Sequence, residues 1–212
     1  MKKGWIIALE GGEGAGKTTI MTTMCKWFTE ENIPFLSTRE PGGVHISEKI
    51  RNVILDKEHN VMDCRTEALL FAAARRQHLV EKVRPALKDG KVVIFDRYVD
   101  SSLVYQGYVR GIGMKEVFDL NAFAIEGLLP DITLYFDLSP EVGLSRIEAS
   151  DVREVNRLDL EALDFHKKVR EGYLLLSQSN KRFEVINAEQ SIEDVLIDVK
   201  KVLIEKGILK NE

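Results

Sequence analysis

The chain has 212 residues, of which 44% are hydrophobic and 30% are charged, and its formal net charge is −4 at pH 7. These values are typical of one globular domain with a full-sized core, and the acidic balance argues against binding to nucleic acid as the main task. No apolar run is long enough to cross a membrane or to serve as a signal peptide, and two cysteines, Cys25 and Cys64, suit a reducing compartment. We therefore expect a single domain over residues 1–212, in the cytoplasm, with no nucleic-acid or membrane partner.

A glycine-rich segment follows the first apolar run. Trp5–Leu9 is typical of a strand, residues 11–18 fit the pattern G-x-x-x-x-G-K-[ST], and an amphipathic helix is expected beyond Lys17. Glycines let successive N–H groups point at one anion, and the helix N-terminus adds partial positive charge. The segment predicts a nucleoside triphosphate site, with Lys17 on the β- and γ-phosphates and Thr18 on Mg²⁺. The residues expected to form it are Gly11, Gly12, Glu13, Gly14, Ala15, Gly16, Lys17 and Thr18.

Strand patterns alternate with helical periodicity along the chain. The expected strands are Trp5–Leu9, Phe35–Thr38, Val92–Phe95, Ile132–Asp137 and Phe183–Asn187. Apolar residues recur at helical spacing in residues 46–54, 117–124 and 192–203. This alternation predicts an α/β fold with a parallel sheet and helices on both faces, which binds its ligands at the carboxyl ends of the strands.

Charged residues follow two of these strands. Arg39 and Glu40 come after the second strand, Asp96 and Arg97 come after the third, and Arg51 lies on the helix between them. An acidic residue at the end of a strand is typical of the Mg²⁺-supporting aspartate of phosphate-loop enzymes. Each arginine alone could be a solvated surface charge. Because all three are expected at the ligand edge of one sheet, they favour a second phosphate, carried by an acceptor substrate.

Two further segments favour a pocket for a base. Phe71 and Arg75 are four residues apart on an expected helix, so a ring and a guanidinium share a face. From this helix alone, core packing of Phe71 and solvation of Arg75 are slightly favoured. Ser102 and Gln106 have the same spacing in the segment "SSLVYQG", which offers a polar face if it is helical. Together the two segments favour recognition of a heterocycle.

The most polar interruption of the pattern, "ASDVREVNR" at Ala149–Arg157, is expected to form a mobile lid, placed approximately at residues 146–157. The interior of the glycine-rich loop supplies no cation, whereas phosphoryl transfer gains from a cation near the transferring group. The lid region carries Arg146, Arg153 and Arg157. We expect Arg153 to supply that charge because it lies in the middle of the lid.

The motifs "EGGEGAGKT", "TREPGG", "TEALLFAAARRQH", "DRYVDSSLVYQG" and "PDITLYFDL" closely resemble those of bacterial thymidylate kinase. The match is spread from about Leu9 to Asp159, and "REPGG" followed by "DRY", "SS" and "YQG" is far more specific than the phosphate loop. The resemblance implies a phosphate-loop nucleoside triphosphate hydrolase-like fold with a five-stranded parallel sheet. It also implies a homodimer that transfers the γ-phosphoryl group of ATP to dTMP, with Mg²⁺, and releases dTDP.

The resemblance further implies a role for each matching residue. Phe71 would stack on thymine, Arg75 would contact a thymine carbonyl, and Tyr105 would lie under the sugar and disfavour a 2′-hydroxyl. Glu40 and Asp96 would lie near the metal and the reacting phosphates, with Thr18 and Asp96 as the metal ligands. The implied substrate-binding residues are Arg39, Arg51, Phe71, Arg75, Arg97, Ser102, Tyr105 and Gln106. The implied catalytic residues are Lys17, Glu40, Asp96, Arg97 and Arg153.

Three other functions fit the sequence less well. A GTPase switch needs an N-K-x-D motif and a D-x-x-G motif after the third strand, but this chain has "DRYV" there and no N-K-x-D. Another deoxynucleotide or deoxynucleoside kinase stays open, although a deoxynucleoside acceptor would give three arginines no phosphate to bind. A pure binding module leaves the acceptor residues unexplained.

Overall fold

The computed structural model describes residues 4–148, 158 and 161–210. Its centre is a sheet of five parallel strands in the order β2-β3-β1-β4-β5. The strands are β1 (Ile6–Gly11), β2 (Phe35–Arg39), β3 (Val92–Asp96), β4 (Ile132–Asp137) and β5 (Phe183–Asn187). The predicted five-stranded parallel sheet is confirmed, and β1 extends beyond the expected strand so that it includes Glu10.

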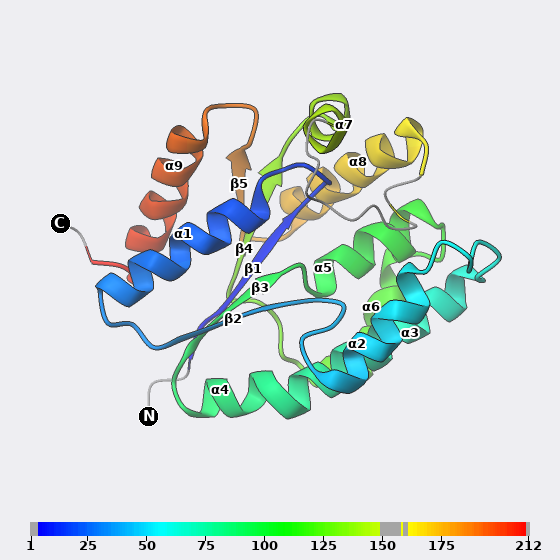
Figure 1. Ribbon diagram of the computed structural model, residues 1–212, viewed down its shortest axis with the longest axis horizontal. Helices are drawn as coiled ribbons and strands as arrows, with labels where there is room; N and C mark the ends of the chain where they lie inside the picture. The colour runs from blue at the N-terminus through cyan, green and yellow to red at the C-terminus, as the bar shows by residue number, and fades with distance from the viewer. Residues whose placement is uncertain (1–3, 149–157, 159–160, 211–212) are drawn as a thin grey trace.

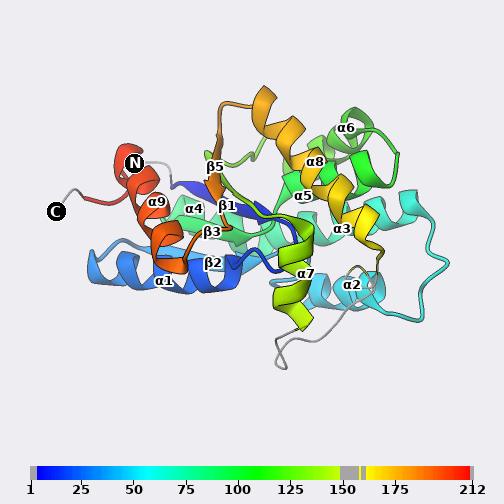
Figure 2. The ribbon, with the colours of Figure 1, turned by 90° about the horizontal axis from the view of Figure 1, so that it is seen from above.

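Helices flank the sheet on both sides (Figures 1 and 2). The α-helices are α1 (Lys17–Glu30), α2 (His45–Leu55), α3 (Cys64–His78), α4 (Arg84–Lys88), α5 (Val99–Ser102), α6 (Met114–Ile125), α7 (Pro140–Glu148), α8 (Leu163–Ser179) and α9 (Ile192–Glu205). Two π-helical segments join this set, η1 (Leu79–Val83) and η2 (Leu103–Val109). Among the described residues, no helix is long and apolar enough to cross a membrane.

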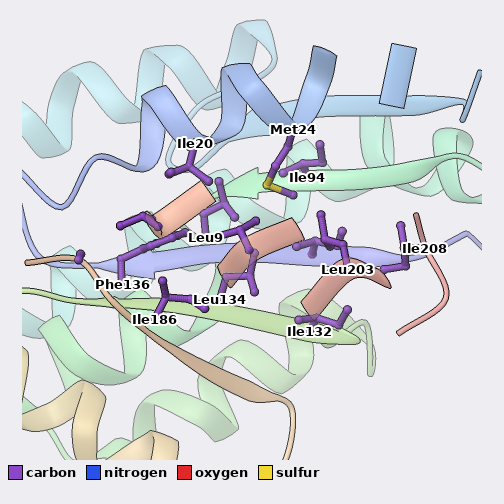
Figure 3. Packing of buried hydrophobic residues seen from close by; sticks show 14 of the residues in the cluster. Leu9, Ile20, Met24, Ile94, Ile132, Leu134, Phe136, Ile186, Leu203 and Ile208 are labelled. Carbon is purple, nitrogen blue, oxygen red and sulfur yellow. The ribbon is translucent and has the colours of Figure 1, made fainter. Parts of the chain in front are cut away.

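Successive side chains of β1 point to opposite faces of the sheet, and a separate hydrophobic cluster covers each face. Ile7 and Leu9 face α1 and α9, where Ile20 and Leu203 pack against them (Figure 3). Ile6 and Ala8 point to the other face, where η1 and α4 cover them. Both faces are buried, which is the reason that the strands read as continuous apolar runs in the sequence. The polar ends of β1, β2 and β3 are left at the carboxyl edge.

The segment "SSLVYQG" differs from the simple helix considered for it. A single turn of α-helix, α5, passes directly into η2, whose hydrogen bonds are of the wider π type. π-helical turns inside helices are rare and are frequent at functional sites. Ser102, Tyr105 and Gln106 nevertheless all line one cavity, so the expectation that these side chains share a surface is met by a different helix geometry.

Candidate active site

One cavity of about 330 Å³ lies at the carboxyl edge of the sheet. Its wall combines the glycine-rich loop with the ends of β2 and β3 and with side chains of α2, α3, α5 and η2. The volume falls in the range of small-molecule sites. All eight expected substrate-binding residues line it, together with Lys17, Thr18, Glu40 and Asp96. The structure therefore brings the expected donor and acceptor residues to a single space.

The glycine-rich loop has the backbone that an anion site needs. Gly16 caps α1 with φ 82°, a left-handed conformation that favours glycine, and Lys17 begins the helix. The Lys17 ammonium donates to the carbonyl oxygens of Gly11 at 3.1 Å and Gly12 at 2.8 Å. A Cβ on Gly14 would lie 2.2 Å from the carbonyl oxygen of Gly143, so the loop packs directly on the backbone of α7. Burial and the nearby Arg97 guanidinium lower the pKa of Lys17 to about 8.

Glu13, inside the loop, holds two acceptor-side residues. Its carboxylate accepts from Arg97 Nη2 at 2.8 Å and from the Tyr105 hydroxyl at 2.8 Å. His166 Nδ1 lies 3.4 Å from its other oxygen. Burial raises the pKa of Glu13, but the Arg97 charge, the His166 hydrogen bond and the Lys17 charge outweigh that effect and hold it well below its usual range. An ionised Glu13 thus ties the glycine-rich loop to Arg97.

The other two arginines of the expected acceptor cluster meet at one carbonyl group. Arg39 Nη1 and Arg51 Nη1 donate to the oxygen of Pro41 at 3.3 Å and 3.0 Å. Arg39 also pairs with Glu48 at 3.0 Å, and its side chain is 46% exposed. Arg39 and Arg51 therefore converge beside the turn that follows β2, while Arg97 approaches the cavity from the turn after β3.

Arg75 lies at the centre of a buried network. Its Nε donates to Glu40 Oε2 at 2.7 Å, and its Nη2 donates to the carbonyl of Tyr98 at 3.2 Å and to Ser102 Oγ at 3.2 Å. A hydrogen bond also joins Arg75 to Asn121. The residue is 1% exposed, so the alternative of a solvated Arg75 does not hold. Fixed in this way, Arg75 forms part of the cavity wall.

The carboxylate of Glu40 is fully engaged by protein groups. Besides Arg75, His78 Nδ1 lies 3.0 Å from Glu40 Oε1, and His78 Nε2 lies 2.8 Å from Thr38 Oγ1. Since a carboxylate accepts only, the Nδ1–H of His78 donates to Glu40, while Nε2 is within hydrogen-bond distance of the Thr38 hydroxyl. Glu40 lines the cavity, yet the geometry shows its charge directed at Arg75 and His78, so the expected role near the metal stays a prediction.

Phe71 and Gln106 lie on the wall that the sequence assigns to a base. Phe71 is half-buried and lines the cavity. The Gln106 side chain is 1% exposed and donates to Glu67 Oε1 at 2.9 Å, which fixes its amide. A half-buried ring beside oriented amide and guanidinium groups is the set of contacts that a planar heterocycle needs.

The expected metal ligands line the same cavity as the glycine-rich loop. Thr18 offers a hydroxyl and Asp96 a carboxylate, and oxygen ligands of this kind suit Mg²⁺. Across the described part of the chain, no group of three or more histidine, cysteine, aspartate or glutamate residues is arranged to hold a metal by itself. Mg²⁺ usually binds through one or two protein oxygens and substrate phosphates, so the two residues fit the group without such a cluster.

Part of the expected lid belongs to α7. Arg146 lies on this helix and donates to the carbonyl of Ala188 at 3.2 Å. Residues 149–157, with Arg153 and Arg157, lie outside the described residues. That Arg153 supplies the positive charge beside the transferring phosphoryl group therefore stays a prediction.

Comparison with known proteins agrees with this geometry. Residues 9–199 match the family model of thymidylate kinase. This chain belongs to the thymidylate kinase family. It is 61% identical over 201 residues to a thymidylate kinase of Clostridium novyi, covering 94% of this chain and 98% of that protein. It is 53% identical over 210 residues to that of Bacillus licheniformis, covering 99% of each.

A solved thymidylate kinase structure from Ehrlichia chaffeensis superposes with a TM-score of 0.75 at 31% identity, covering 95% of this chain and 98% of that one. The family predicted from the motifs is confirmed, and so is the phosphate-loop fold that thymidylate kinases share. The relatives extend over nearly the whole chain, including the C-terminal helices that carried no specific motif.

Sequence reasoning missed several residues that build this thymidylate kinase site. Glu10 could have been found by the same signal as Asp96, since it is an acidic residue at the end of an apolar strand. His78, Asn121 and Tyr173 carry no local signal, because the hydrogen bonds that join them to Glu40, Arg75 and Glu10 span at least 38 residues of sequence. Such contacts exist only once the fold has brought the segments together.

Proposed function

We propose that this chain transfers the γ-phosphoryl group of ATP to dTMP, giving dTDP, as part of dTTP synthesis. The observation that carries the proposal is one cavity bounded by an anion-binding loop on one side and by Phe71, Arg75 and Arg97 on the other. Phosphoryl transfer depends mainly on positioning and electrostatic stabilisation. A shared cavity supports both, because it can hold donor and acceptor in line.

On the donor side, the loop N–H groups and Lys17 bind the triphosphate. Lys17 acts as a catalytic cation because charge spreads over the oxygens of the transferring group. Thr18 and Asp96 would hold Mg²⁺, which neutralises phosphate charge when it is bound.

On the acceptor side, Arg39, Arg51 and Arg97 bind the dTMP phosphate, and paired guanidinium donors suit its geometry. Phe71 stacks on thymine, while Arg75, Ser102 and Gln106 face its polar edges. Tyr105, whose hydroxyl donates to Glu13, lies under the sugar and disfavours a 2′-hydroxyl. This arrangement accounts for every residue expected on the acceptor side.

The alternative, another deoxynucleotide or deoxynucleoside kinase, has less support. The relatives that are 50–61% identical over at least 91% of this chain are named thymidylate kinase. A nucleoside acceptor would leave the guanidinium groups of Arg39, Arg51 and Arg97 without a phosphate to bind.

The test is a panel of acceptors with ATP and Mg²⁺, with ADP formation measured. We expect dTMP to be the best acceptor among the nucleoside monophosphates and thymidine to be inactive. A higher kcat/KM with thymidine, or with a purine monophosphate, would contradict the proposal.

We also infer a homodimer in the cytoplasm. Helix α3 lies between α2 and α6 and packs on both (Figure 1). All three helices expose large apolar side chains. Phe123 is 88% exposed and Leu69 is 56% exposed, which supports a protein interface on these helices. The two free thiols, Cys25 and Cys64, support a reducing compartment. Sedimentation should give a dimer for the unmodified chain and a monomer for Phe123→Asp, and a monomeric unmodified chain would contradict the inference.

A further inference from the structure

Glu10 is a buried carboxylate that the proposed reaction does not use. It lies near the end of β1, immediately before the glycine-rich loop, and its exposure is 0%. A buried charge is costly unless hydrogen bonds satisfy it. Four donors meet this carboxylate: the N–H of Tyr98 in the turn after β3, the N–H and hydroxyl of Ser101 on α5, and the hydroxyl of Tyr173 on α8. Its environment therefore joins three distant segments of the chain.

One oxygen of Glu10 fixes the backbone next to Arg97. Arg97 has φ 64°, a left-handed conformation that is uncommon for a residue with a side chain. Its N–H donates to the carbonyl of Leu9 at 3.0 Å, and the following N–H, of Tyr98, donates to Glu10 Oε1 at 2.8 Å. The end of β1 thus holds both peptide groups that flank this unusual conformation.

The other oxygen of Glu10 reaches the Arg97 guanidinium through two hydroxyl groups. Ser101 Oγ donates to Glu10 Oε2 at 2.6 Å, and the Tyr173 hydroxyl donates to it at 2.7 Å. Arg97 Nη1 in turn donates to each of these hydroxyl oxygens at 3.3 Å. The guanidinium only donates, so both hydroxyl oxygens accept from Arg97 and keep their protons for Glu10 or, across 2.9 Å, for each other.

Arg97 is consequently held from two sides. Nη2 pairs with Glu13, which lines the cavity, whereas Nη1 is held by the Ser101 and Tyr173 hydroxyls in front of Glu10. Tyr173 is 0% exposed, and its ring stacks on Tyr135 with the centroids 5.0 Å apart. The tyrosine hydroxyl is therefore fixed in place by the packing of α8 on the sheet.

We propose that Glu10 is a positioning residue, which acts through the hydroxyl groups of Ser101 and Tyr173 to aim the Arg97 guanidinium at the acceptor phosphate. The proposal rests on the proposed function only in taking Arg97 as a phosphate ligand. Glu10 is not among the residues that line the cavity. Its effect is to keep Arg97 in one orientation before the acceptor arrives, which lowers the cost of ordering this side chain on binding.

The experiment compares single-hydroxyl variants with a matched control. Tyr173→Phe and Ser101→Ala each remove one link to Arg97, and Tyr135→Phe removes the hydroxyl of the neighbouring stacked ring, which is bonded to Asp137. We expect each of the first two to raise KM for dTMP about 2- to 10-fold, the scale of one hydrogen bond. KM for ATP of these two variants should stay within about twofold of the value for the unmodified enzyme. All kinetic constants of Tyr135→Phe should stay within the same range, which corresponds to less free energy than one hydrogen bond contributes.

A double-variant cycle shows whether the effect passes through Arg97. In an Arg97→Ala background, Tyr173→Phe should cause no further rise in KM for dTMP, because the group that it positions is gone. Glu10→Gln has only one acceptor oxygen, so it can accept from the two hydroxyls or from the backbone N–H groups of Tyr98 and Ser101, but not from both pairs. It should reproduce the KM pattern of the Ser101→Ala and Tyr173→Phe pair. If Glu10→Gln does not fold, the hydroxyl variants still decide the matter.

Two results would overturn the proposal: unchanged KM for dTMP in both hydroxyl variants, or a Tyr173→Phe effect of equal size with and without Arg97. Loss of thermal stability with unchanged KM would show that the contacts are merely structural. Failure of the proposed function is a separate result, since it appears in the unmodified enzyme as lack of turnover with dTMP. In that event the KM comparison is made with the best acceptor of the panel.

Discussion

The donor and acceptor sides of the cavity are built in different ways. On the donor side, eight consecutive residues form the glycine-rich loop, and Lys17 bonds to carbonyl groups only five and six residues away. On the acceptor side, Arg75 bonds to residues between 23 and 46 positions away. The first site is specified by a local motif, whereas the second exists only when α3, η2 and α6 have packed together.

This contrast predicts different consequences of substitution. A change in the loop should remove function and leave the fold, because Lys17 serves mainly the ligand. A change in the acceptor network should affect both, because its ion pairs are buried and each partner depends on the other. Substitutions on each side of the cavity test these consequences.

Lys17→Ala should have the largest effect. It removes the cation beside the transferring phosphoryl group, and we expect kcat to fall by about 10²-fold or more, the scale of one catalytic donor. Thermal unfolding should change little, which circular dichroism can check on the same sample. Near-normal turnover by a folded variant would show that the loop is not the ATP site.

Substitutions at Phe71 and Arg75 should weaken the binding of dTMP much more than the binding of ATP. Loss of stacking is worth about 1–3 kcal/mol in base-binding proteins, which corresponds to roughly 5- to 150-fold in KM for dTMP. Arg75→Ala should in addition lower the free energy of unfolding by about 3–5 kcal/mol, because it leaves Glu40 buried without its ion pair. Phe71→Ala removes no charge, so it is the matched comparison for the change in the free energy of unfolding. Equal rises in KM for dTMP and for ATP would show that these residues are structural.

Arg153→Ala should lower kcat by at least about tenfold, roughly 1.4 kcal/mol, with both substrates saturating. Its KM for dTMP should change less, since the interaction forms mainly in the transition state. Arg157→Ala and Arg146→Ala are the comparisons, and Arg146 already donates to Ala188 in the structure. If kcat falls less than tenfold in all three variants, the positive charge beside the transferring phosphoryl group does not come from this segment.

Binding of ATP should be coupled to proton uptake above neutral pH. The pKa of Lys17 is about 8 in the free protein, so about half of the ammonium groups are deprotonated at pH 8. Bound phosphates favour the charged form and raise this pKa, so binding at pH 8 should take up about half a proton. Affinity should fall as pH rises above 8. Calorimetry in buffers of different ionisation enthalpy measures the uptake, and Lys17→Ala should abolish it.

The difference between the two sides also explains what the sequence could predict. The five strands, their parallel arrangement and the phosphate loop follow from local patterns, and all are present in the structure. The identities of the cavity residues were available through family motifs. The partners of Glu40 were not, since His78 and Arg75 lie on a helix that only tertiary packing brings to β2. The π-helical geometry of η2 had no recognisable signal either.

Equilibrium binding of each substrate alone tests the division of the cavity most directly. Isothermal titration calorimetry would measure ATP and dTMP separately on the unmodified enzyme, on Lys17→Ala and on Phe71→Ala. We predict that Lys17→Ala weakens ATP and leaves the Kd for dTMP within about twofold, well under the 1.4 kcal/mol of a tenfold change. Phe71→Ala should weaken dTMP and leave ATP unchanged. Loss of dTMP binding in Lys17→Ala together with normal dTMP binding in Phe71→Ala would contradict the assignment of the two sides.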